Sequence, residues 1–157
     1  MLAEAEGRLC DAEILSRSLA ATSDSAELLR ILALEVLLKT WLCAKSVKLR
    51  RNHNYRGLWD AFEQDAQDSV LLGAAVVDPG RLSAATVPIL LSNWETVFKK
   101  ARYYYEFYED YSLHEQHELG QFWISIGAPE SEAEVRYFPE ELRALTHGLI
   151  AHIRSTA

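Results

Sequence analysis

Two pairs of oppositely charged residues lie one helical turn apart in this chain. Glu35 and Lys39 fall in a leucine-rich stretch, whereas Arg102 and Glu106 fall in an aromatic one. A spacing of four residues brings both members of a pair to one face of a helix. A buried Glu35 or Lys39 without a partner would be costly, so we expect each to contact the other or a polar group of another helix. Two interpretations remain open, an ion pair that fixes helix packing and a polar pocket inside a bundle.

Arg102, which Glu106 follows one turn later, could hold an anion. Both lie beside a seam that includes Phe98 and Tyr105, which predicts that they are half buried. A guanidinium group flanked by aromatic rings can clamp a phosphate while a base stacks on a ring. The alternative is a solvated ion pair, which would contribute little to stability.

A basic cluster follows the leucine-rich stretch, and phosphate would prefer this part of an otherwise acidic chain. The alternative is a solvated loop that balances nearby acids. Its histidine stands between two asparagines at the entrance of a predicted helix, from which it can hydrogen-bond inward. The members of the cluster are Lys45, Lys48, Arg50, Arg51, His53 and Arg56.

Arg143 and His147 lie one turn apart near the end of the chain. A histidine can move a proton at neutral pH, and a neighbouring arginine can hold a scissile phosphate, so the two residues form a candidate catalytic pair. Alternatively, Arg143 is solvated and His147 lies at the core edge with a satisfied nitrogen. The segment from His114 to His117 falls one residue short of the HExxH zinc motif and has no evident third ligand, so no metal or cofactor is expected.

The elements that hold these residues are predicted to be helices, because only 4 prolines and 7 glycines interrupt the 157 residues. We expect one all-α domain over residues 1–157. Its β-branched and aromatic stretches at 121–126 and 134–138 predict a small β-hairpin or an extended arm before the last helix. The predicted helices cover residues 2–20, 25–47 and 57–75, a long segment from Pro88 and a last one from Pro139, while 111–120 reads as loop or fraying helix.

The net charge and the hydrophobicity of the chain argue against some classes of protein. A net charge of -7 argues against a general nucleic-acid binder, although it leaves room for a local basic site. The longest apolar run, Leu28 to Cys43, contains Arg30, Glu35 and Lys39, so no membrane contact is expected. Acidic residues stand where a signal peptide would be basic, and the expected location is therefore cytoplasmic.

The order of these features resembles the HEPN superfamily of small helical proteins. The likeness covers residues 25–110. It rests on Glu35 and Lys39 in a leucine-rich helix, on His53 before a Leu-x-x-x-Phe helix, and on the Phe98–Glu106 segment that contains Arg102. The resemblance implies an up-and-down bundle of four to five helices, often dimeric. It also implies a site lined by His53, Arg102 and Glu106, with Glu35 and Lys39 behind them.

Members of that superfamily include ribonucleases of toxin–antitoxin, phage-defence and RNA-processing systems, and also non-catalytic nucleotide-binding or interaction modules. The nuclease members carry arginine, four to six residues and then histidine, whereas three residues separate Arg143 from His147 here. The resemblance also implies a homodimer or an antitoxin-like or nucleotidyltransferase-like protein as partner.

Three functional hypotheses follow. The first is a weakly catalytic or non-catalytic module that binds a nucleotide, RNA, another anionic ligand or a protein partner. The second is a metal-independent ribonuclease that uses Arg143 and His147. The third is a structural or adaptor protein whose interface is the aromatic helix and the 121–138 segment, since exposed tyrosine and tryptophan side chains often anchor interfaces.

Overall fold

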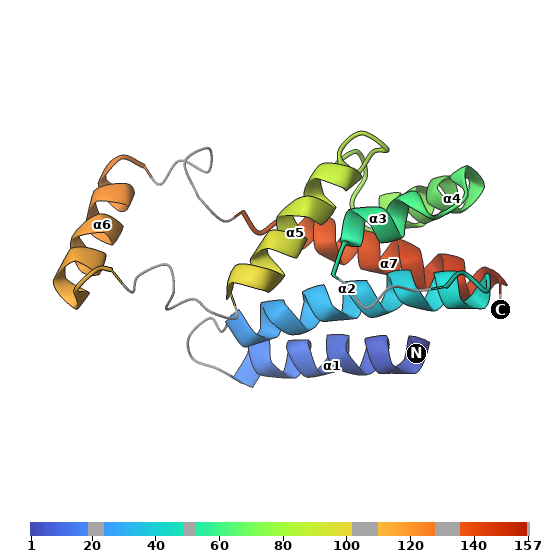
Figure 1. Cartoon of the computed structure of the whole chain (residues 1–157), viewed down its shortest axis with the longest axis horizontal. Coiled ribbons are helices and arrows are strands. Elements are labelled where there is room, and N and C mark those ends of the chain that lie inside the picture. The colour runs from blue at the N-terminus through green and yellow to red at the C-terminus, as the bar shows by residue number, and fades with distance from the viewer. Residues whose placement is uncertain (19–23, 49–52, 102–109, 128–135, 157) are drawn as a thin grey trace.

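The computed structural model describes residues 1–18, 24–48, 53–101, 110–127 and 136–156. These residues form helices and connecting segments and contain no strand, so the expectation of an all-α fold is confirmed (Figure 1). No helix among them is long and apolar enough to cross a membrane. The helices are α1 (Leu2–Ser18), α2 (Asp24–Ala44), α3 (Tyr55–Asp60), α4 (Gln64–Ala75), α5 (Val87–Ala101), α6 (Leu113–Ser125) and α7 (Pro139–Thr156).

The prediction of a β-hairpin is wrong for its first strand, which was expected at residues 121–126. Residues 121–125 belong to α6, and residues 136–138 lie outside any helix or strand, while 134–135 are outside the described residues. A capping box begins α6, because the Ser112 hydroxyl accepts a hydrogen bond from the Glu115 backbone and the Glu115 carboxylate accepts one from the Ser112 backbone. That local signal outweighs the strand preference of the aromatic and β-branched residues that follow.

Helix number also differs from the four to five that the resemblance implied. The segment predicted as one helix over 57–75 is divided into α3 and α4, and α6 is additional. Asn54 begins α3 by accepting a hydrogen bond from the Gly57 backbone N–H at 2.7 Å. The remaining predicted helices begin within a few residues of the expected positions, as is usual for helix boundaries, and the expected continuation of the Pro88 helix beyond Ala101 lies outside the described residues.

Helix α2 forms the centre of the core. It packs against α1 on one side and against α3, α5 and α7 on the others, and α4 covers α7 (Figure 1). Buried leucines occupy several of its faces, which explains why its sequence shows no single apolar stripe. The largest fully buried side chains include Trp59 and Trp94, which α3 and α5 contribute to the same core.

Two glycines allow α4 and α7 to cross at very short range. A Cβ atom built on Gly148 of α7 would lie 2.2 Å from the Val70 carbonyl oxygen and 2.9 Å from the Ala74 nitrogen, both on the backbone of α4. On the α4 side, a Cβ on Gly73 would lie 3.1 Å from the Gly148 Cα. The backbones therefore pack directly against each other, and this contact fixes the position of α7.

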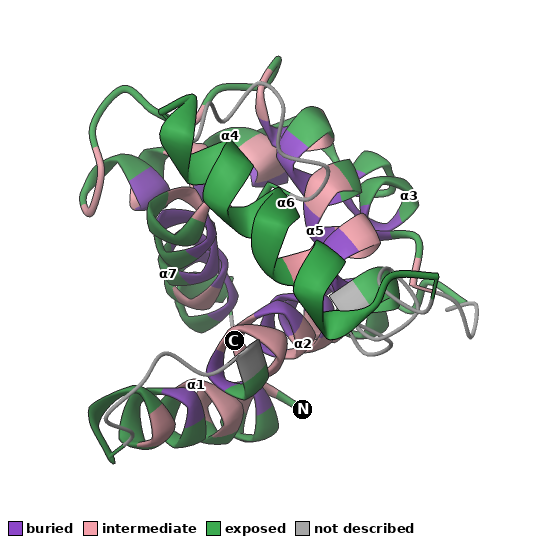
Figure 2. Cartoon of the chain, turned by 90° about the vertical axis from the view of Figure 1, so that its left-hand side faces the viewer, coloured by how far each residue is buried: buried purple, intermediate pink, exposed green. Residues whose placement is uncertain are grey.

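Helix α6 differs from the others because it has no buried residue. It stands apart from the remaining helices, and it is exposed along nearly its whole length (Figures 1 and 2). The bundle of α1–α5 and α7 thus forms the folded body, and α6 projects from it.

Candidate functional site

The predicted pairing of Glu35 is confirmed, and its contacts come from two directions. Its side chain is 6% exposed, and Oε1 accepts a hydrogen bond from Lys39 Nζ at 2.5 Å. The other oxygen, Oε2, lies 2.8 Å from His53 Nδ1. The carboxylate therefore joins its own helix to the segment that precedes α3. Both carboxylate oxygens are engaged, which is how a buried acid is retained in a core.

These contacts decide the protonation state of Glu35. Burial acts to raise its pKa, but the hydrogen bonds from Lys39 and His53 and their positive charge outweigh burial, so the pKa lies below its ordinary value. The carboxylate is consequently ionised at neutral pH.

His53 connects this cluster to α5. Its ring centroid lies 4.8 Å from that of Phe98, and two residues later the Tyr55 backbone N–H donates to Glu95 Oε2 at 3.2 Å. Glu95 also pairs with Lys99 one turn away. The cluster of Glu35, Lys39 and His53 thus holds the entrance of α3 against α2 and α5, which favours the ion-pair interpretation over a polar pocket.

The structure does not describe the remaining residues that were predicted for this site. Arg102 and Glu106 lie outside the described residues, as do Arg50 and Arg51 of the basic cluster. Two described members of that cluster contact residues outside the Glu35 site. Lys45 Nζ lies 4.7 Å from the centroid of the Trp41 ring, and Arg56 Nε lies 3.7 Å from Asp60 Oδ2.

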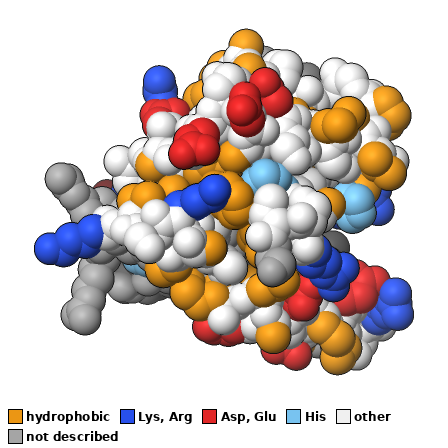
Figure 3. Space-filling view, turned by 90° about the vertical axis from the view of Figure 1, so that its right-hand side faces the viewer, with side chains coloured by type: hydrophobic (Ala, Val, Ile, Leu, Met, Phe, Trp, Pro, Cys, Tyr) orange, Lys and Arg blue, Asp and Glu red, His pale blue; other side chains and the backbone are white. Residues whose placement is uncertain are grey.

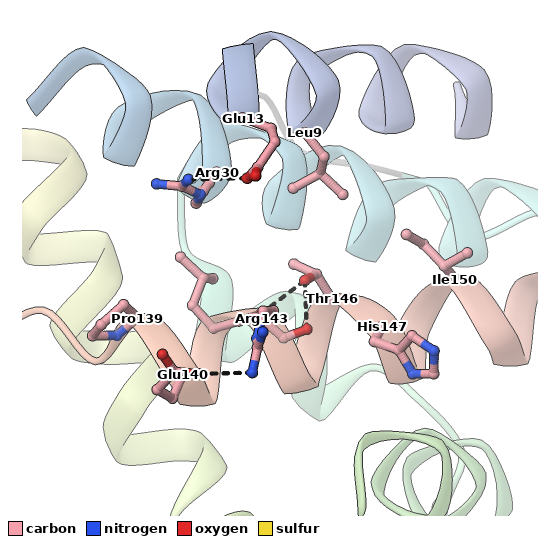
Figure 4. Close-up of a pocket in the computed structure, with 10 residues that line it drawn as sticks. Leu9, Glu13, Arg30, Pro139, Glu140, Arg143, Thr146, His147 and Ile150 are labelled. Atoms are coloured by element: carbon pink, nitrogen blue, oxygen red, sulfur yellow. Dashed lines mark hydrogen bonds and ion pairs between the residues drawn. The ribbon is translucent and has the colours of Figure 1, made fainter. Parts of the chain in front are cut away.

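Arg143 and His147 line a cavity that we call the α1–α7 groove (Figure 4). Its volume is about 430 Å³, which is in the range of small-ligand sites. Both residues are exposed, so Arg143 is solvated as the alternative interpretation expected. His147 is more exposed than that interpretation expected, but one of its ring nitrogens is satisfied, as expected. The lining residues are Leu9 and Glu13 of α1, Arg30 of α2, and Pro139, Glu140, Leu142, Arg143, Thr146, His147 and Ile150 of α7.

The charged side chains of the groove have nearby partners of opposite charge. Arg143 Nη2 lies 2.9 Å from Glu140 Oε2 (Figure 4), and Arg30 Nη1 lies 2.6 Å from Glu27 Oε1. His147 is held differently, because its Nδ1 donates to the Gly73 carbonyl oxygen at 3.2 Å. The proton of neutral His147 is therefore on Nδ1, which leaves Nε2 as the nitrogen that can accept a proton.

A buried histidine, His152, was missed by the sequence reasoning. It is 7% exposed, its ring centroid lies 4.3 Å from that of Trp41, and its Nδ1 lies 2.9 Å from Ser69 Oγ. Its Nε2 is buried and has no hydrogen-bond partner among the residues that the structure describes. Burial lowers its pKa, and the Lys45 ammonium lowers it further. The sequence offered no signal, since the partners come from α2 and α4.

We expect His152 to make stability depend on pH. Its pKa in the unfolded chain is near 6.5, and its folded pKa is lower. Below pH 6.5 the unfolded chain binds a proton that the folded chain does not, so the free energy of unfolding should fall as the pH decreases. The limiting slope is about 1.4 kcal/mol per pH unit. Urea denaturation of the parent and of His152→Gln at several pH values should give a steeper loss for the parent, and equal slopes would contradict this assignment.

Helix α6 carries an apolar face that nothing in the described chain covers. Leu119, Phe122, Trp123 and Ile126 recur at helical spacing, and Phe122 is 62% exposed. The opposite side holds His114, Gln121 and also the exposed Ile124, whereas Glu118 lies one turn before Phe122 and borders the apolar face. His114 Nε2 lies 3.4 Å from Glu118 Oε1, and the described residues contain no group of side chains that could hold a metal ion.

The sequence around α6 also carries the net charge of the protein. Residues 103–135 contain eight Asp and Glu and no Lys or Arg. Since the whole chain has 23 acidic and 16 basic residues, the remainder has 15 and 16 and a net charge of +1. Accordingly, the face of the body turned away from α6 mixes both signs of charge with apolar side chains (Figure 3). Acidity is thus a property of one segment.

Comparisons of the chain with protein-family models, with curated proteins and with solved structures found no match.

Proposed function

We propose that this protein is a non-catalytic interaction module that binds a protein partner through the apolar face of α6. The observation that carries the proposal is a well-capped amphipathic helix without a single buried residue. Exposed aromatic side chains on such a helix are typical anchors of a helix-in-groove interface. The proposal takes up the protein-partner version of the HEPN-like binding module that the resemblance implied.

The length of α6 supports this proposal. It has 13 residues, including Gly120 in its interior. Isolated helices shorter than about 12–15 residues are only marginally stable in water. Its capping box adds on the order of 1 kcal/mol, which does not replace tertiary packing. A helix of this kind becomes stable when a partner covers its apolar face.

The charge of the segment defines the chemistry of the partner. Asp110, Glu115 and Glu118 accompany the exposed apolar side chains, and no Lys or Arg lies between residues 103 and 135. Nucleic acid and anionic membranes would be repelled, because both present negative charge. The matching surface is an apolar protein groove bordered by basic side chains.

A photo-crosslinking amino acid tests this proposal. Benzoylphenylalanine at position 122 lies on the apolar face, and the same group at Gln121 lies on the opposite face as a matched control. We expect a discrete protein adduct from position 122 in expressing cells and little from position 121. Reversing charge with Glu115→Lys and Glu118→Lys should reduce the adduct about tenfold. Equal adducts at both positions, or none, would refute the proposal.

A second candidate function is binding or cleavage of a phosphate-bearing ligand in the α1–α7 groove. The favouring observation is that Arg143 and His147 are both exposed and line one cavity. In a ribonuclease, His147 Nε2 would take the proton and Arg143 would stabilise phosphate charge. Adenosine monophosphate should then shift the His147 ring signals in an NMR titration, and Arg143→Ala should abolish the shift. Cleavage of single-stranded RNA that survives His147→Ala would exclude the catalytic role.

A further inference from the structure

We propose that the partner of α6 is a second copy of this chain, with α6 of each protomer lying in the α1–α7 groove of the other. This inference rests on the proposed function and adds the identity of the partner and its binding surface. Two features of one molecule carry it, a helix whose apolar face is uncovered and a groove of similar length that has an apolar end and a charged end.

The groove is open because α1 and α7 both pack on α2 and leave a space between them. They run antiparallel, since Glu6 Oε1 and Arg154 Nη2 meet at one end at 2.7 Å, while Glu13 lies with Glu140 and Arg143 around the same cavity at the other. A helix placed between α1 and α7 would form a four-helix arrangement together with α1, α2 and α7.

The groove is nearly as long as α6. Its α7 wall extends from Pro139 to Ile150, a rise of about 17 Å, and the 13 residues of α6 extend about 20 Å. Leu9 and Ile150, both partly exposed, provide its apolar surface, and Leu142 lies buried beneath it. The apolar face of α6, with Phe122 and Trp123 at its centre, is the complementary element.

The charged and apolar ends of the groove set the direction in which α6 would lie. Its charged residues, Arg30 and Arg143 together with Glu13 and Glu140, are near the start of α7, whereas Ile150 is toward its end. Glu115 lies in the first turn of α6, and the large apolar side chains lie in its second half. Placing α6 parallel to α7 therefore brings Glu115 to Arg143 and Phe122 to Ile150. The Arg143 side chain is 67% exposed and held by a surface pair with Glu140, so it is accessible to a second carboxylate.

Symmetry favours two copies. Each protomer would offer one helix and accept one, so the exchange closes as a dimer and leaves no unfilled groove. The body has a net charge of +1 while residues 103–135 carry eight acids, so each acidic segment would lie against a nearly neutral body and not against the other acidic segment. Repulsion between the two acidic segments is thereby reduced.

Sedimentation velocity of the full chain tests the inference. The parent should sediment as a species of twice the 17.8 kDa chain mass. The double variant Phe122→Asp, Trp123→Asp should sediment as a monomer, and Gln121→Asp, on the opposite face, should remain a dimer. Arg143→Glu should weaken dimerisation about tenfold, and adding Glu115→Lys and Glu118→Lys to the same chain should restore it.

The remaining outcomes separate this inference from the proposed function. A monomeric parent whose position-122 crosslinker attaches to another protein would refute the second copy but leave the interaction module. An adduct within one chain would show α6 in its own groove and would refute the dimer. A dimer that survives Phe122→Asp, Trp123→Asp would use another surface and would also refute the inference.

Discussion

Replacing Gly148 with alanine should lower the free energy of unfolding by about 3 kcal/mol or more, at the upper end of the usual effect of overpacking. The new Cβ would lie 2.2 Å from the Val70 carbonyl oxygen and 2.9 Å from the Ala74 nitrogen. Both atoms belong to the backbone of α4, so no side-chain rotation can relieve the clash. Relief requires that α4 and α7 separate, which would open the core along their crossing.

Gly7→Ala is the matched control for this change. Gly7 lies within α1, and a Cβ built there meets nothing within 4 Å. Alanine is the better helix former, so this variant should be more stable than the parent by about 0.5–1 kcal/mol. Urea midpoints of both variants, with unchanged slopes, measure the effects. Similar shifts of the two midpoints would show that α4 and α7 do not cross at Gly148.

Replacing Glu35 with alanine should lower the free energy of unfolding by about 3 kcal/mol at neutral pH. The change removes a buried carboxylate and leaves Lys39, whose side chain is 19% exposed, without this counter-charge. It also releases His53, which holds the entrance of α3. The double variant Glu35→Met, Lys39→Met should recover much of the loss, because an apolar pair avoids the buried charge.

The effect of Glu35 should also depend on pH. Its folded pKa lies below the ordinary value of 4.5, so its contribution is complete above that pH and is lost as the pH falls through the folded pKa. The stability difference between the parent and Glu35→Ala should therefore shrink when the pH is lowered from 7 toward about 3. A difference that stays constant over this range would mean that the ionised carboxylate is not the stabilising group.

Local sequence signals predicted most of the helices. Apolar spacing and the position of Pro88 and Pro139 located α5 and α7, and the capping pattern of Ser112 and Glu115 was available for α6. The β-branched and aromatic run after Gly120 instead predicted a strand, which is wrong because the helix that begins at this capping box continues through Ser125. No glycine or proline lies between α3 and α4, so the sequence gives no local signal for the break between them. We attribute that break to tertiary packing.

The candidate site was predictable only where its contacts are local. The pairing of Glu35 with Lys39 follows from four-residue spacing, whereas the contact with His53 spans 18 residues and needed the fold. His152 and Gly148 depend on how α4 meets α7, and no periodicity in one segment reveals such a contact. The concentration of acids over residues 103–135 was visible in the sequence but gains meaning only once α6 is seen to project.

Hydrogen exchange of the α6 amides at increasing protein concentration tests the central claim most directly. If α6 docks into the groove of a second copy, its amides should exchange rapidly in dilute protein and become protected as the concentration rises. Amides of α7 should be protected throughout, because α7 belongs to the core. Rapid exchange of α6 at every concentration, or protection that does not change with dilution, would contradict the account.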